Sequence, residues 1–169
     1  MKTKFIALAA LLASTGVVSA QEENKSGYQF TDIAIYINNK SETSLAFMVT
    51  NYGLIDTLNF YDFFVTSETA NIAIVVVSNY GIINSILCNG TIICDYAEGL
   101  ASLLCCKNFS IITSCETNGL LRSLQWAGGV CGGNTSFGQI IDCLNRAEIL
   151  GAYTGGICRM DGWNDCEMC

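Results

Sequence analysis

The sequence predicts an all-α protein built from short helical hairpin repeats, followed by a disulfide-rich, turn-rich C-terminal part. Three observations lead to this prediction. A segment of about 28 residues recurs along the chain, apolar residues within each copy follow a helical spacing, and all 10 cysteines lie between Cys88 and Cys169. A period of this length is typical of a supersecondary unit that stacks on its neighbours to cover its apolar face.

The first 20 residues have the pattern of a secretory signal peptide. Lys2 and Lys4 form a charged start, residues 5–12 an apolar stretch, and residues 18–20 (Val-Ser-Ala) a small-residue cleavage site. The apolar stretch is shorter than the roughly 20 residues that a membrane-spanning helix needs. We therefore expect residues 21–169 to form a single secreted domain.

The repeat is clearest in two copies. The Asn-Tyr-Gly step at residues 51–53 recurs at 79–81, and a Ser-Glu-Thr step precedes each by about ten residues. A third, weaker copy covers residues 103–115. We assign residues 41–115 to the helical repeats.

Each copy is interpreted as two short helices joined at the Asn-aromatic-Gly step. Ser41 and Ser67 are the expected N-caps, and Gly53 and Gly81 supply the left-handed residue that ends the first helix. Apolar residues then follow a helical spacing at Leu54, Ile55, Leu58 and Tyr61.

The β-branched run at residues 72–77 also fits a buried strand. We favour a helix there, because the equivalent run at residues 45–49 contains better helix formers and copies of one repeat share a backbone.

Residues 88–169 form the predicted disulfide-rich part. Gly128–Gly133 is a turn-rich stretch, and one more helix is expected over residues 139–150, ended by Gly151. An even number of cysteines in a secreted chain indicates disulfides, whose pairing the sequence leaves open. The ten are Cys88, Cys94, Cys105, Cys106, Cys115, Cys131, Cys143, Cys158, Cys166 and Cys169. Zinc is the weaker alternative, because the chain has a single C-x-x-C and no histidine.

Five positions match the acceptor pattern for N-linked glycans, which agrees with secretion. They are Asn24, Asn39, Asn89, Asn108 and Asn134. Asn108 belongs to the repeated Asn-aromatic step, so we expect it to lie in a solvent-facing turn that accepts a glycan easily.

The composition excludes several kinds of chemistry. The chain has no histidine, which removes the common catalytic triads and histidine metal sites. Its net charge of −7 and its eight scattered basic residues disfavour nucleic acid as a partner. Paired carboxylates, such as Asp161 with Asp165 or Asp95 with Glu98, are the remaining route to a hydrolase. We predict no catalytic residues, metal or cofactor.

The steps Gly-Leu-Ile-Asp-Thr-Leu at residues 53–58 and Gly-Ile-Ile-Asn-Ser-Ile at 81–86 resemble the helical repeats of secreted and cell-wall proteins of budding yeasts. The similarity covers residues 41–115. It implies a secreted or wall-associated protein and brings no catalytic residues with it.

The functional prediction is a secreted, non-catalytic glycoprotein that acts as an extracellular or cell-wall-associated interaction or structural protein. An extracellular protein or a cell-wall polysaccharide is the expected partner. One alternative is a membrane-active toxin or effector that uses the uncharged segment 69–94 as a membrane-inserting hairpin. Another is a carrier that holds an apolar ligand between its helices.

Overall fold

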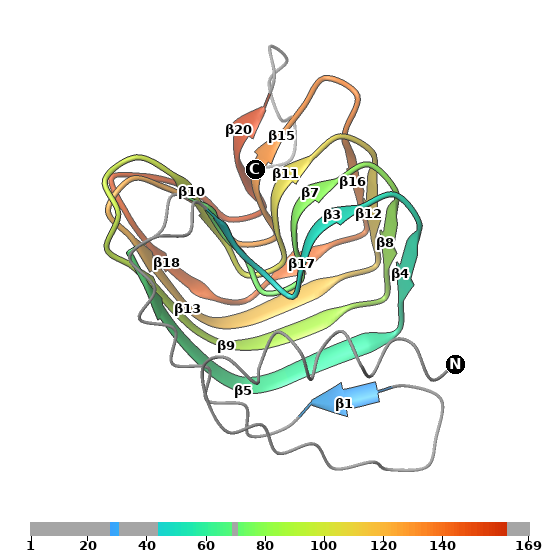
Figure 1. Ribbon diagram of the computed structural model, residues 1–169, viewed down its shortest axis with the longest axis horizontal. Coiled ribbons are helices and arrows are strands. Elements are labelled where there is room, and N and C mark those ends of the chain that lie inside the picture. The colour runs from blue at the N-terminus through green and yellow to red at the C-terminus, as the bar shows by residue number, and fades with distance from the viewer. Residues whose placement is uncertain (1–27, 31–43, 69–70, 162–169) are drawn as a thin grey trace.

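The computed structural model describes residues 28–30, 44–68 and 71–161, which form a parallel β-solenoid of about four turns (Figure 1). These segments contain strands and no helix. The all-α prediction is therefore wrong, and the 28-residue period is one winding of a solenoid, here called a rung, instead of a helical hairpin.

Four strand positions recur in each rung. Rung 1 contains β2 (Ser44–Leu45), β3 (Met48–Asn51), β4 (Leu54–Asp56) and β5 (Leu58–Ser67). Rung 2 contains β6 (Asn71–Ile72), β7 (Val76–Asn79), β8 (Ile82–Asn84) and β9 (Leu87–Cys94). Rung 3 contains β10 (Leu100–Ser102), β11 (Cys105–Asn108), β12 (Ile111–Thr113) and β13 (Glu116–Ser123). Rung 4 contains β14 (Trp126–Gly128), β15 (Cys131–Asn134), β16 (Gln139–Ile141), β17 (Leu144–Asn145) and β18 (Glu148–Leu150). A fifth rung begins with β19 (Tyr153–Gly155) and β20 (Cys158–Asp161).

Equivalent strands of successive rungs pair in parallel and build four sheets. Sheet A has the order β1-β5-β9-β13-β17, with β18 also beside β13 and β1 (Tyr28–Phe30) beside β5. Sheets B, C and D have the orders β19-β14-β10-β6-β2, β20-β15-β11-β7-β3 and β16-β12-β8-β4. The long strands β5, β9 and β13 of sheet A lie along one side, and the short strands of the other sheets close the rungs around a common interior (Figure 1).

The interior is made of columns of apolar side chains that repeat from rung to rung. In sheet D, Ile55, Ile83, Ile112 and Ile140 occupy one register position. The first three are buried, and Ile140 packs against the same core. Alternate residues of a strand point to opposite faces, so one inward residue in each short strand is enough to build a column.

The apolar spacing that predicted helices has a different cause. Thr57, Ser85, Ser114 and Asp142 have positive φ angles between 50° and 54° at the corner from sheet D to sheet A. In rung 1, left-handed Thr57 lies between Ile55 in β4 and Leu58 in β5. The two apolar residues therefore belong to different strands on either side of a corner and not to one face of a helix.

Other predicted helix features are also corrected. Residues 72–77 lie in β6, the following bend and β7, and the predicted helix over 139–150 is β16, β17 and β18. Gly128–Gly133 belongs to β14 and β15, so rung 4 continues the same solenoid. Ser67 is the last residue of β5, and Ser41 lies outside the described residues.

A ladder of buried asparagines connects the rungs at the corner between sheets C and D. The Nδ2 group of Asn51 donates to Oδ1 of Asn79, Asn79 donates to Asn108, and Asn108 donates to Asn134, each at 2.8 Å. Within its own rung, each of the first three also accepts a bond from the backbone N–H two residues later. Buried polar groups must be paired in this way to avoid a desolvation cost, so the ladder fixes both the corner and the rung spacing.

The shape of this corner depends on a close backbone approach at Gly81. Gly81 does not have the positive φ that a helix C-cap would need, and neither does Gly53. A Cβ atom at Gly81 would instead collide with the Gly53 carbonyl oxygen of the rung below. Glycine is therefore required here because the backbones of adjacent rungs touch.

We expect Gly81→Ala to lower the free energy of unfolding by about 3 kcal/mol, because the added methyl forces two hydrogen-bonded rungs apart. Gly53→Ala is the matched control, since a Cβ there has nothing within 4 Å, and its effect should stay within about 0.5 kcal/mol. Urea denaturation of both variants measures the difference. Equal stabilities would contradict the rung contact.

We expect Asn79→Ala to cost about 2–4 kcal/mol, because Asn79 is fully buried and its loss removes one ladder hydrogen bond from Asn51 and one from Asn108. Asn84→Ala removes a bond to Asp56 that lies at the surface and should cost about 0.5 kcal/mol. The midpoints of urea denaturation of the two variants measure the difference in stability. Equal midpoints would show that the ladder does not stabilise the stacking of the rungs.

Candidate functional site: an exposed apolar strip

Two columns of apolar side chains run along the outside of the solenoid beside the asparagine ladder, exposed in rungs 1 and 2 and half-buried in rung 3. The aromatic column consists of Tyr52, Tyr80 and Phe109, each directly after a ladder asparagine. The aliphatic column consists of Leu54, Ile82 and Ile111, which share one register position in sheet D. We call these six residues the apolar strip. Tyr52 is 79% exposed and Leu54 is 58% exposed, so the strip is most exposed to solvent in rung 1.

The aromatic rings stack on one another across the rungs. The ring centroids of Tyr52 and Tyr80 are 5.3 Å apart with an interplanar angle of 14°, and those of Tyr80 and Phe109 are 4.4 Å apart with an angle of 9°. Both faces of the Tyr80 ring are therefore covered by its neighbours. The stack presents ring edges to the outside, and the open ring face is that of Tyr52.

Polar side chains border the strip on both sides. One column, in sheet C, is formed by Thr50, Ser78 and Lys107. The other, in sheet D, is formed by Asp56, Asn84 and Thr113, with Nδ2 of Asn84 donating to Oδ1 of Asp56 at 2.8 Å. An apolar centre with a polar rim is the usual anatomy of a protein interaction surface.

A second apolar cluster lies on the outer face of sheets B and C. Val77 and Cys106 belong to this cluster, whereas their neighbours Val76 and Cys105 belong to the interior. Adjacent residues of a strand point to opposite faces, so the cluster lies outside the solenoid. Trp126, the first residue of β14, packs against it. Most of this cluster is buried, so it holds sheets B and C together.

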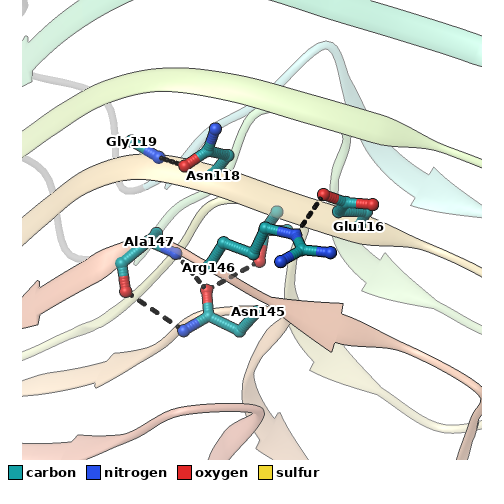
Figure 2. Close-up of polar contacts among 7 residues, drawn as sticks. Glu116, Asn118, Gly119, Asn145, Arg146 and Ala147 are labelled. Atoms are coloured by element: carbon teal, nitrogen blue, oxygen red, sulfur yellow. Dashed lines mark hydrogen bonds and ion pairs between the residues drawn. The ribbon is translucent and has the colours of Figure 1, made fainter.

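The contacts on sheet A are structural. Asn145 accepts bonds from the Thr117 hydroxyl at 2.8 Å and from the Ala147 N–H at 3.1 Å, while Nε of Arg146 lies 2.8 Å from Oε1 of Glu116 on the preceding rung (Figure 2). The asparagine repeats the corner geometry of the ladder, and the ion pair is exposed. Exposed pairs contribute on the order of 0–1 kcal/mol.

Of the candidate carboxylate pairs, Asp95 with Glu98 lies within the described part of the chain. Asp95 and Glu98 are exposed, and Asp95 is 3.7 Å from Arg122 in an exposed ion pair. The backbone of Asp161 is in register with Asn134, and Asp165 lies outside the described residues. Among residues 28–30, 44–68 and 71–161, no three His, Cys, Asp or Glu side chains converge on a metal position.

The cysteines lie mostly in the interior. Eight are described, all as thiols, and all but Cys143 are buried, while Cys166 and Cys169 lie outside the described residues. Cys105, Cys131 and Cys158 share one register position in sheet C. Burial raises the pKa of Cys88 and Cys106 above the usual range of a thiol, so these two behave as small apolar core residues. The disulfides predicted from the sequence stay a prediction. The rungs limit which cysteines can pair, because only those on adjacent rungs at the same position lie close together.

The predicted glycan acceptors have different surroundings. Asn108 is fully buried, so the expectation of a solvent-facing turn is wrong: its Nδ2 donates to Ser110, Asn134 and Gln139. Asn89 and Asn134 are half-buried, and Asn24 and Asn39 lie outside the described residues.

The uncharged segment 69–94 does not form the membrane-inserting hairpin that the sequence suggested. Its described residues, 71–94, form β6 to β9, which is rung 2. Most of its aliphatic side chains, including Ile72, Ile83 and Ile92, are fully buried in the interior. Within the described segments, no helix has the length and apolar character to cross a bilayer.

The surface role of Tyr52, Tyr80 and Phe109 is not predicted from the sequence, where these residues serve only to mark the repeat. Their signal was an aromatic residue after the asparagine in all three copies. In a solenoid, residues at the same position of successive repeats stack on one another, so an aromatic residue that recurs at one position forms a stack of rings.

No protein-family model, curated protein or solved structure matches the chain.

We expect Asn108 to carry no glycan in protein from its native host, because the atom to be modified, Nδ2, is enclosed in the ladder. Glycopeptide mapping with enzymatic deglycosylation in water enriched in oxygen-18, which marks each former glycan site as a labelled aspartate, checks this site against Asn89, which is half-buried. A fully occupied Asn108 would contradict the ladder.

Proposed function

We propose that the chain is a secreted, non-catalytic interaction module that binds an extracellular protein through the apolar strip. The observation that carries the proposal is the strip itself: a contiguous set of aromatic and aliphatic side chains, exposed in rungs 1 and 2 and bordered by polar columns. Single exposed apolar residues are ordinary on a protein surface, but contiguous patches of this kind mark interaction sites.

The stacking of the rings favours a protein over a polysaccharide. Aromatic residues that bind sugar rings use an open ring face, and here the neighbouring rings occupy the faces of Tyr80. Ring edges together with the branched side chains of Leu54 and Ile82 instead form a surface suited to apolar side chains.

The strip is the centre of the proposed interface and does not account for all of it. Parallel strands are about 4.8 Å apart, so three rungs extend about 10 Å along the solenoid. A stable complex buries roughly 800 Å² on each partner. The partner must therefore also contact the polar columns that contain Thr50 and Asp56.

Secretion remains part of the proposal and is supported by the signal-peptide pattern of residues 1–20. The absence of histidine from the whole sequence supports a non-catalytic role. We favour the interaction module over the two alternatives drawn from the sequence, because residues 71–94 pack as rung 2 and the described residues are strands where the carrier hypothesis placed helices.

We expect the double variant Tyr52→Ser, Ile82→Ser to bind its protein partner at least about tenfold more weakly, because truncating central apolar residues of an interface typically costs more than about 1 kcal/mol each. The control is Leu124→Ser, Leu150→Ser, which removes two exposed leucines outside the strip, one directly after β13 and one at the end of β18. Its binding should be unchanged.

The measurement uses immobilised full-length mature protein, exposed separately to the secreted protein fraction and to the insoluble wall polysaccharide of its native host. Retention of one protein by the wild type and by the control, and its loss with the strip variant, supports the proposal. Retention of polysaccharide that depends on the strip would replace the protein partner by a glycan. Equal binding by the strip variant and the control would exclude the strip.

A further inference from the structure

Two cysteines meet at the corner between sheets D and A in rungs 3 and 4. Cys115 follows Ser114 and precedes β13, and Cys143 follows Asp142 and precedes β17. The N–H of Leu144 donates to the carbonyl oxygen of Cys115 at 2.9 Å, and Leu144 is the register partner of Glu116. The two cysteines are therefore stacked on adjacent rungs.

The stacking places the two sulfur atoms within reach of each other. Adjacent strands are about 4.8 Å apart, which lies within the range of about 4.4–6.8 Å between the Cα atoms of a disulfide. The Cys143 thiol donates to the carbonyl oxygen of Ile112 on rung 3 at 3.8 Å, so its sulfur faces the rung that carries Cys115. The Cys115 thiol donates within its own rung to the carbonyl oxygen of Thr113 at 3.1 Å.

Accessibility distinguishes this pair from the other cysteine column. Cys131 contacts both Cys105 and Cys158, but all three are buried. Among the described cysteines, Cys143 alone is partly exposed. A dissolved oxidant needs an accessible sulfur to react, so the reaction should begin at Cys143.

The two thiols also differ in acidity. The neighbouring Cys115 thiol lowers the pKa of Cys143, whereas the neighbouring Cys143 thiol and burial raise the pKa of Cys115. Cys143 is therefore the better source of the thiolate that attacks, and Cys115 is placed to attack second.

We propose that Cys115 and Cys143 form a disulfide that joins rungs 3 and 4, with Cys143 as the attacking sulfur and Cys115 as the resolving one. The oxidant is a low-molecular-weight disulfide. The Cys143 thiolate attacks one sulfur of the oxidant and releases the other half as a thiolate. Cys115 then loses its proton, attacks the Cys143 sulfur and releases the second half. Two protein thiols are oxidised and one small disulfide is reduced to two thiols.

The bond would secure the last complete rung. Rung 4 is followed only by β19 and β20 in the described chain, so it lies near the C-terminal end of the solenoid. A covalent link at its corner opposes the separation of this rung from rung 3.

The test uses full-length protein that has been reduced under native conditions and then exposed to increasing oxidised glutathione. Free thiols are blocked with an alkylating reagent in denaturant before digestion with trypsin. Cys115 then lies in peptide 108–122, while Cys143 shares peptide 123–146 with Cys131. We expect these two peptides to become linked through Cys143 at about tenfold lower oxidant than modifies any buried cysteine.

Single serine variants test the assigned roles. Cys115→Ser should leave Cys143 carrying a stable glutathione, because the resolving sulfur is missing. Cys143→Ser should abolish both the link and the modification of Cys115. Cys131→Ser is the matched control from the same tryptic peptide and should leave the link intact. A link that runs through Cys131, or full alkylation of both Cys115 and Cys143 at every oxidant concentration, would overturn the proposal.

Discussion

The structure depends on the exact vertical stacking of equivalent residues on successive rungs, and the buried asparagine ladder is the interaction that enforces it. Each ladder side chain bonds to its own backbone and to the next asparagine at 2.8 Å. A shift of one residue would leave several buried amide groups unpaired, at a cost of about 1–3 kcal/mol each. This constraint sets the register for all four sheets.

The same stacking creates both functional features of the molecule. Because Tyr52, Tyr80 and Phe109 follow the ladder residues, their rings are held face to face on the surface and form one side of the apolar strip. Because Cys115 and Cys143 follow the left-handed corner residues, their thiols meet between two rungs. A single register thus supports both the proposed binding surface and the proposed disulfide between buried Cys115 and partly exposed Cys143.

Apolar, polar and charged side chains occupy separate parts of the fold. Interior positions are filled by isoleucine, leucine, valine and cysteine, and the apolar strip lies outside beside polar columns. The described ion pairs, Arg122 with Asp95 and Arg146 with Glu116, are exposed and connect adjacent rungs. The apolar interior and the exposed ion pairs both have a structural explanation. The apolar strip is the feature that remains for binding.

The sequence alone determined the repeat, its period and the residues that recur in it, because these are properties of the order of amino acids. The Asn-aromatic step and the apolar runs were located correctly. The sequence did not determine that each copy is a rung of parallel strands, because two short strands separated by a left-handed corner, as around Thr57, place apolar residues at intervals that also fit a helix. Only the tertiary structure decided that Asn108 is buried, that the aromatic residues form a stack and which cysteines are neighbours, since these facts arise from contacts between rungs about 28 residues apart.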